Sequence, residues 1–320
     1  HSKVETAVPG DICPVPRVDE AHYGAVLHDS HDEDHFHLKP IQMPRPMFGL
    51  AIRPQNDADA QKTSDALQVA EAEDPSIQVE HNAALNEVVL LGLGELHLAT
   101  ILQQIEDRYS LDLVTSLPSI AYRETITAKA EGHHRHKKQT GGAGQFGEVY
   151  LRIEPLPQGG GFEFGSAVVG GAIPSQFIPA VENGVRQAMK EGAILGYRMQ
   201  DIKLPVYDGK HHNVDSKEIA FVQAGKKAFL DAVSKARPIV MEPIVDAEFS
   251  VPSDCVGGVT GDLSGMRGMI TGTDALPDNR ALVSGKVPLQ ELQGYHSRLK
   301  SLTGGDGSFT MDFSHYAEIP

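Results

Sequence analysis

The fold of the first third of the chain is decided by residues 87–114, EVVLLGLGELHLATILQQIEDRYSLDLV. A short apolar run at residues 88–91 predicts a strand, and glycines 92 and 94 follow it. Apolar side chains then recur at i, i+3, i+4, i+7 and i+11, which is the spacing of one helical face. They are Leu98, Ile101, Leu102, Ile105 and Tyr109. A second strand is expected at residues 111–114, so the stretch predicts strand, helix and strand.

The residues before this stretch complete a recognisable order. Residues 47–52 predict a strand, residues 57–73 a helix that Asp57 caps and Pro75 terminates, and residues 77–79 another strand. The expected inner face of that helix is weakly apolar and consists of Ala60, Ser64, Leu67, Val69 and Ala70. A polar turn separates the third strand from residue 88. The order β-α-β-β-α-β is that of the split βαβ, ferredoxin-like motif.

The same order returns near the end of the chain. Val245, Ala247, Phe249 and Val251 alternate at period two, which predicts a half-buried strand. A helix capped by Ser253 should follow, then strands at residues 269–273 and 280–287, a second helix and a last strand at 308–313. The expected inward side chains of the two helices are Val256, Val259, Leu263, Leu292, Tyr295 and Leu299.

A third body lies between the two repeats. It should contain strands at residues 121–129 and 148–153, a helix at 177–191 and a strand that ends at Tyr207. A loop at residues 208–214 then leads into a long helix capped by Asp215 or Ser216. The helix should bury Ile219, Val222, Phe229 and Val233.

We therefore expect a multidomain α+β chain. We call residues 41–118 the first module, 119–236 the central body and 237–320 the last module, and we take residues 1–40 as the remnant of an upstream domain with a linker. Pro118 and Pro238 mark the boundaries, and no sheet should cross them.

Net charge differs between these segments. The whole chain carries −15, which argues against a general affinity for nucleic acid. Residues 1–40, 41–120, 121–236 and 237–320 carry −5, −8, +3 and −5 respectively. The central body alone is basic, as in a protein that offers one part to an anionic partner.

Composition excludes several other classes. Two cysteines without metal-ligand spacing exclude a disulfide framework and a zinc site of the CxxC type. No apolar run is long enough for a membrane span and no signal peptide opens the chain, so we expect a soluble, cytoplasmic protein without membrane contact. The run HDSHDEDHFH at residues 28–37 contains metal-ligand types without defined spacing, and we assign no metal site to it.

The wording of seven segments resembles elongation factor G. They are LGLGELHL (91–98), AYRETI (121–126), HKKQTGGAGQFGEV (136–149), YDGKHHNVDSKEIAF (207–221), MEPI (241–244), GVTGDL (258–263) and SFTMDFSHY (308–316). The resemblance implies the third, fourth and fifth domains of that family, with ferredoxin-like third and fifth domains and a fourth domain similar to ribosomal protein S5. Residues 1–40 would then end the family's second domain, a β-barrel.

The family uses GTP hydrolysis to drive tRNA and mRNA through the ribosome, or to split ribosomes. The phosphate-binding motif GxxxxGK[ST] does not occur in these 320 residues. The resemblance therefore implies that GTP and Mg²⁺ belong to a GTPase domain outside this sequence. For the residues in hand we expect no catalytic residue, no cofactor and no GTP binding, and we expect a monomer whose partners are ribosomal RNA and the tRNA–mRNA pair in the decoding region.

The resemblance places the contacting tip on two loops of the central body. Residues that match these loops, or stand in them, are Gly141, Gly142, Gly144, Gln145, Asp208, Gly209, His211, His212, Asn213 and Asp215. Arg135, Lys137 and Lys138 precede the first loop and should supply phosphate attraction. Ala143 stands where the family often has Arg, and Asp306 replaces an arginine of a turn in the fifth domain, which reverses the charge there.

Other functions stay open on sequence alone. Within the superfamily they are ribosome recycling and protection of ribosomes from tetracycline. From other classes they are a metalloenzyme that uses residues 28–37, and an interaction protein whose acidic modules bind something other than RNA.

Overall fold

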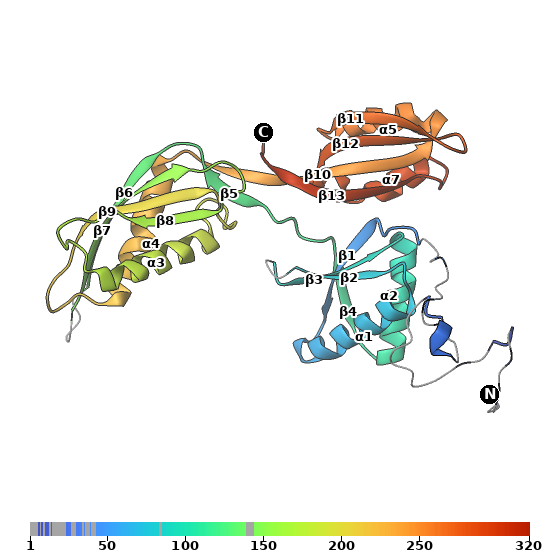
Figure 1. Ribbon diagram of the computed structural model, residues 1–320, viewed down its shortest axis with the longest axis horizontal. Coiled ribbons are helices and arrows are strands. Elements are labelled where there is room, and N and C mark those ends of the chain that lie inside the picture. Colours follow the sequence, from blue (N-terminus) through green and yellow to red (C-terminus); the bar gives the residue numbers. More distant parts are fainter. Residues whose placement is uncertain are drawn as a thin grey trace. The chain divides into compact units, whose positions relative to one another are not determined.

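The computed structural model describes residues 6, 8, 10–12, 14, 24–26, 30–33, 35, 39, 43–82, 85–138 and 144–320. The chain divides into two compact units, residues 1–118 and 119–320 (Figure 1). The fold is mixed α+β with three separate sheets, as the sequence predicts. None of the helices in the described ranges is long and apolar enough to cross a membrane.

The first module is a four-stranded antiparallel sheet with the order β2-β3-β1-β4. Its strands are β1 (Phe48–Pro54), β2 (Gln78–Asn82), β3 (Glu87–Gly92) and β4 (Leu113–Ser116), and its helices are α1 (Ala60–Glu73) and α2 (Glu95–Tyr109). Leu98, Leu102 and Ile105 of the predicted stripe are buried against Leu90 and Ile52. The predicted β-α-β-β-α-β order is confirmed.

Two details of helix α1 differ from the expectation. Asp57 does not cap the helix; Asn56 caps a short 3-10 turn (Asp57–Asp59) that precedes it, because its side chain accepts a hydrogen bond from the Ala58 backbone N–H at 3.1 Å. The buried face consists of Thr63, Ala66, Leu67 and Ala70. With so little apolar contrast along this helix, the sheet beneath it decides which side is covered.

The last module repeats the topology with the order β11-β12-β10-β13. Its elements are β10 (Pro238–Pro252), α5 (Val256–Gly265), β11 (Met269–Leu276), β12 (Arg280–Pro288), α6 (Leu289–Leu292), α7 (Tyr295–Leu302) and β13 (Ser308–Glu318). An aromatic cluster of Phe249, Tyr295 and Phe309 forms its centre, with ring centroids 5.4–6.3 Å apart. Ser253 does not cap α5; it begins a short 3-10 turn, η4 (Ser253–Cys255), that precedes the helix.

The central body has a sheet of order β6-β7-β9-β8, and its strands are β6 (Ala130–Lys138), β7 (Gln145–Pro155), β8 (Phe162–Ser166) and β9 (Ile202–Lys210). Helices α3 (Ile178–Glu191) and α4 (Glu218–Lys235) cover one face of it. Lys217 occupies the N-cap position of α4, so neither Asp215 nor Ser216 caps it as expected. Of the side chains expected in the core, Val222, Phe229 and Val233 are buried and Ile219 is exposed; the helix also buries Phe221.

One sheet crosses a predicted boundary. Strand β5 (Arg123–Ile126), which precedes the central body's own sheet, pairs antiparallel with the first residues of β10, from Pro238↔Ile126 to Met241↔Arg123. The expectation that no sheet would cross residue 237 is therefore wrong. Strand β10 is long enough to serve two partners, because its later residues pair with β12 and β13.

Candidate RNA-contacting end of the central body

The two loops named by the sequence lie against each other at one end of the central body. The Phe146 backbone N–H donates to the Asp215 carbonyl at 2.9 Å, and the Ser216 hydroxyl donates to the Phe146 carbonyl at 3.0 Å. These bonds join the start of β7 to the segment that follows β9. We call residues 144–146 and 211–216 together the tip.

His212 is held in one orientation within the tip. Its Nδ1 accepts from the backbone N–H groups of Val214 and Asp215, at 3.3 and 3.2 Å. The Asp215 carboxylate also lies 3.5 Å from Nδ1, but the two shorter contacts are with N–H donors, and a neutral ring whose Nδ1 accepts them carries its proton on Nε2. The imidazole is 56% exposed, and its Nε2–H is therefore a donor available to an incoming acceptor.

Two glycines are required by close contacts in and beside the tip. A Cβ at Gly144 would lie 2.9 Å from the carboxylate carbon of Asp215, and a Cβ at Gly209 would lie 2.4 Å from the Glu148 carbonyl oxygen. The second clash is with backbone and cannot be relieved by a side-chain movement. Asp208 and Gly209 belong to strand β9, so the prediction that they lie in a loop is wrong. Because Gly209 has no side chain, β9 can pass close to the Glu148 backbone.

The strand that leads to the tip displays the predicted basic side chains. Arg135, Lys137 and Lys138 are exposed on β6, and the Arg135 guanidinium lies 5.2 Å from the centre of the Phe146 ring. The Gln145 side chain already has a hydrogen-bond partner within the protein, since its Oε1 lies 3.0 Å from His136 Nε2. Of the predicted first loop, Gly141, Gly142 and Ala143 lie outside the described residues.

A third segment belongs to this end, and sequence reasoning missed it. His211 Nδ1 donates to the Ala172 carbonyl at 3.2 Å, and the Ile173 side chain fills the space beside Gly209. In the same segment Val169 is 84% exposed, and Gly170 and Gly171 have φ of +69° and +73°. The Gly-Gly pair before Pro174 was the available sign of a tight turn. Asn213 is exposed between the segments.

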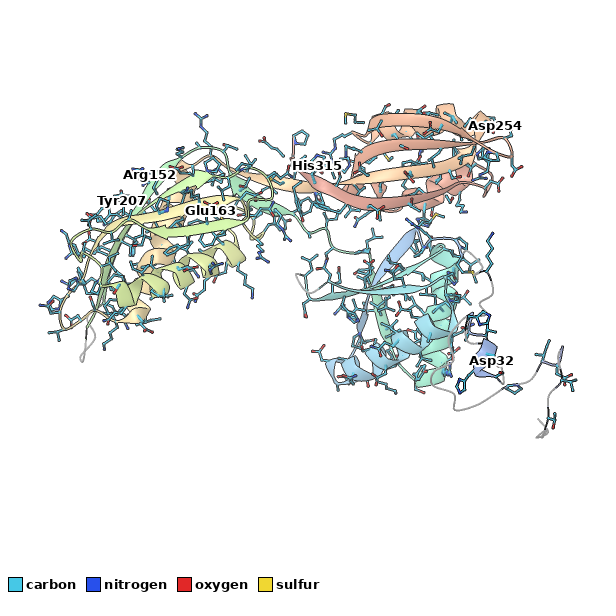
Figure 2. The ribbon with its side chains drawn as sticks, viewed as in Figure 1. Asp32, Arg152, Glu163, Tyr207, Asp254 and His315 are labelled. Atoms are coloured by element: carbon cyan, nitrogen blue, oxygen red, sulfur yellow. The ribbon has the colours of Figure 1, made fainter. Side chains whose placement is uncertain are left out.

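A polar group beneath the basic strand was also missed. The Glu148 carboxylate is buried, and its Oε1 interacts with His133 Nε2 at 2.9 Å and accepts from the Tyr150 hydroxyl at 3.2 Å. The His133 and Tyr150 rings stack at 4.1 Å. Farther along the same face the Arg152 guanidinium lies 5.7 Å from the centre of the Tyr207 ring (Figure 2). Paired side chains therefore cover the sheet face behind the tip.

The turn that contains Asp306 is less acidic than its sequence suggests. The Arg280 guanidinium donates to the Asp306 carbonyl at 3.1 Å and lies 4.0 Å from its carboxylate. Lys300 Nζ donates to the Gly305 carbonyl at 2.9 Å. Arg280, from 26 residues away, and Lys300, from five residues away, thus stand beside the turn and offset part of its negative charge.

Three family models match successive parts of the chain. "Elongation Factor G, domain III" matches residues 43–116, "Elongation factor G, domain IV" matches 118–237 and "Elongation factor G C-terminus" matches 239–320. The chain belongs to the elongation factor G family. The tip accordingly lies in the region that matches domain IV, and the Asp306 turn lies in the C-terminal region.

Similar proteins agree with this assignment. The chain is 38% identical over 320 residues to an elongation factor G-like protein of Thermotoga maritima and 40% identical over 321 residues to elongation factor G of Aquifex pyrophilus. It is covered completely in both alignments but spans only 47% and 45% of those relatives. A crystal structure from Thermus thermophilus matches with a TM-score of 0.76 and 37% identity, over 96% of this chain and 46% of that one. The chain thus spans about half the length of these relatives and matches the models of domain III, domain IV and the C-terminus of the elongation factor G family.

The described residues contain no group of three or more His, Cys, Asp or Glu side chains placed to hold a metal ion. Most of the His/Asp run at residues 28–37 lies outside the described residues, so the structure does not bear on it.

Proposed function

We propose that the tip of the central body contacts RNA on the ribosome and that the whole factor uses this contact to move tRNA and mRNA. GTP hydrolysis would occur in a GTPase domain outside this sequence, where GTP and Mg²⁺ bind. The relatives' names support a role in elongation, and the factor would then act in the cytoplasm.

The observation that carries the proposal is the preorganised His212 ring. Two backbone N–H groups orient it, and its remaining donor is exposed beside the basic end of β6. Lysine side chains attract phosphate over a distance and in a salt-dependent way, whereas an oriented ring donor acts only on contact. This end of the central body therefore combines a steering element, the lysines of β6, with a positioning element, His212 of the tip.

The steering element is tested with the double variant Lys137→Ala/Lys138→Ala in the full-length factor. Both ammonium groups are exposed, so we expect weaker ribosome association, and the slope of log K against log salt should flatten by about one to two. The matched control is Lys203→Ala, which removes an exposed lysine at the opposite end of β9. Equal slopes for the wild-type factor and the double variant would contradict this role.

The positioning element is tested with His212→Ala. We expect nearly unchanged association, because one uncharged donor is lost, but slower tRNA movement in a single-round translocation assay. His315→Ala in the last module is the control for loss of a histidine elsewhere. A His212 variant with normal rates of both translocation and ribosome splitting would refute the proposed contact.

The same variants distinguish the alternative functions. If His212→Ala slows ribosome splitting and leaves tRNA movement unchanged, the factor recycles ribosomes. If the variant affects neither rate but reduces growth in tetracycline, the factor protects ribosomes instead.

A further inference from the structure

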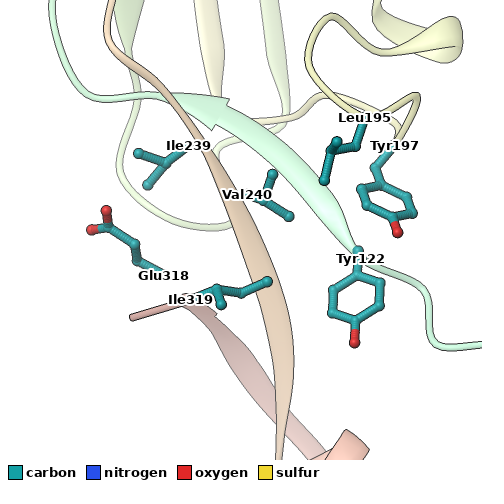
Figure 3. A pocket seen from close by; sticks show the side chains of 7 residues that line it. All are labelled: Tyr122, Leu195, Tyr197, Ile239, Val240, Glu318 and Ile319. Atoms are coloured by element: carbon teal, nitrogen blue, oxygen red, sulfur yellow. The ribbon is translucent and has the colours of Figure 1, made fainter.

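A cavity of about 420 Å³ opens where the central body and the last module share strands β5 and β10 (Figure 3). Its lining consists of Tyr122, Leu195, Tyr197, Ile239, Val240, Glu318 and Ile319. The volume is within the range that small-molecule sites occupy, roughly 300–1,000 Å³. The cavity is remote from the tip in sequence and topology, and nothing in the role proposed above requires it.

One wall of the cavity is held in place by a buried carboxylate. Glu124 accepts hydrogen bonds from four backbone N–H groups of the segment that follows α3, at 2.5–3.0 Å. Those groups belong to Ala193, Ile194, Leu195 and Tyr197. The segment is therefore rigid, although the Leu195 side chain that it carries is 66% exposed.

Tyr122, which lies on the same side of β10 as this wall, is also fixed (Figure 3). The Tyr122 hydroxyl donates to Gln290 Oε1 at 2.7 Å, and its ring lies 5.1 Å from that of Tyr197 at an interplanar angle of 42°. The floor is strand β10, to which the chain's last described residues are attached by a hydrogen bond from Ile319 N–H to the Val240 carbonyl at 3.2 Å. A ligand would meet walls that are already formed, which limits the entropic cost of binding.

The lining has two chemically different ends. Tyr122, Tyr197 and Leu195 gather on one side of strand β10, and Glu318 lies on the other side, with Val240 and Ile319 between them (Figure 3). Aromatic faces and aliphatic side chains favour a flat apolar group. Glu318 is exposed and is the charged member of the lining, so it favours a cation and repels an anion.

We propose that this cavity binds an elongated aromatic amine, with its ring against the two tyrosines and Leu195 and its ammonium group at Glu318. An aliphatic chain joins these groups across Val240 and Ile319. Such a ligand bridges the central body and the last module, because its two ends contact side chains from both.

The probe for this site is 4-phenylbutylamine, added to the 320-residue chain and followed by NMR shifts of the amides at residues 193–197 and 318–319. The neutral 4-phenylbutanol and the anionic 4-phenylbutyrate are the matched comparisons, since they share the ring and chain. We expect saturable binding of the amine, weaker binding of the alcohol and the weakest binding of the carboxylate.

Substitutions at the two ends of the cavity test the two proposed ligand contacts separately. Glu318→Gln should weaken amine binding about two- to fivefold, the range of an exposed ion pair, and leave the alcohol unchanged. Leu195→Ala should weaken both ligands. Glu248→Gln, which changes an exposed carboxylate on the outward side of β10, is the control and should change neither. Amide spectra outside the cavity show that each variant is folded.

The proposal is overturned if the amine gives no saturable shifts, or if the carboxylate binds as tightly as the amine. It is also overturned if Glu318→Gln and Glu248→Gln have the same effect. Because the assay contains no ribosome, these outcomes are independent of the role proposed for the tip.

Discussion

The first and last modules share one topology but differ in the strand that begins it. In the first module this strand, β1, has 7 residues and, within the described part of the chain, pairs with β3 and β4. In the last module it is β10, with 15 residues, and it pairs with β5 as well as with β12 and β13. The additional length of β10 supplies the residues that pair with β5 and so join the last module to the central body.

The modules also differ in where they place an arginine–carboxylate pair. Arg108 and Glu73 of the first module are 58% and 57% exposed. Arg267 of the last module contacts Glu242, whose side chain is only 3% exposed and which lies on β10 beside the β5 pairing. An arginine–carboxylate pair should therefore contribute very different amounts of stability to the two modules.

The largest effect is expected from Arg267→Ala. The guanidinium donates to both Glu242 oxygens, at 2.5 and 3.0 Å, so its loss leaves a buried carboxylate without compensation. Since Arg267 is itself 36% exposed, we expect a loss of about 2–3 kcal/mol in the unfolding free energy of residues 119–320. The unfolding free energy is measured by urea denaturation, and hydrogen exchange measures the protection of individual amides. Unchanged protection of the β10 amides would show that the pair is not structurally important.

An intermediate effect is expected from Glu124→Gln. The amide presents one acceptor oxygen where the carboxylate presents two, so we expect a loss of about 2 kcal/mol and faster amide exchange at residues 193–197. The first module should be unaffected, since it has no strand paired with another body among its described residues. Uniform destabilisation of both units would contradict this assignment.

This effect should depend on pH. Burial tends to raise the pKa of Glu124, but the four backbone donors outweigh it and hold the pKa below the ordinary value of 4.5. A lowered carboxyl pKa contributes stability that is present above the unfolded-state pKa and is lost as pH falls through the folded-state pKa. The wild-type and variant unfolding free energies should therefore differ most above about pH 4.5 and converge in more acidic solution.

The smallest effect is expected from Arg108→Ala. Its guanidinium donates to both oxygens of Glu73, at 2.8 and 3.0 Å, but both side chains are surrounded by solvent. Water and salt replace such a pair at little cost. We expect no measurable change in the thermal midpoint of residues 1–118. A change as large as that of Arg267→Ala would show that the difference between the modules has another cause.

Periodicity predicted most elements of the fold but few of the helix caps. The stripe from Leu98 to Ile105 was strong enough to identify both a helix and its buried face. The capping predictions at Asp57, Asp215 and Ser253 were wrong because 3-10 turns precede α1 and α5 and Lys217 stands at the N-cap position of α4, so that none of these helices has a side-chain cap. Ser216 illustrates this, since its hydroxyl bonds Phe146 and not its own helix.

Sequence wording also located the candidate site, although only in part. It named both segments of the tip, but not their third neighbour at Ala172 or the carboxylate of Glu148 beneath the basic strand. Neither Ala172 nor Glu148 belongs to a motif with a recognisable spacing. Arg280 is similar: it lies 26 residues from Asp306, and only the pairing of strands brings their charges together. The contacting role of the tip residues stays a prediction.

The sequence alone determined the order of elements, the repeated β-α-β-β-α-β pattern and the basic character of residues 121–236, because these depend on side chains close together along the chain. Tertiary structure alone decided that β5 leaves its own body to pair with β10, and that Glu124 collects four amides some 70 residues away. A strand's edge accepts any partner with a free backbone, so its choice depends on packing that no local pattern records.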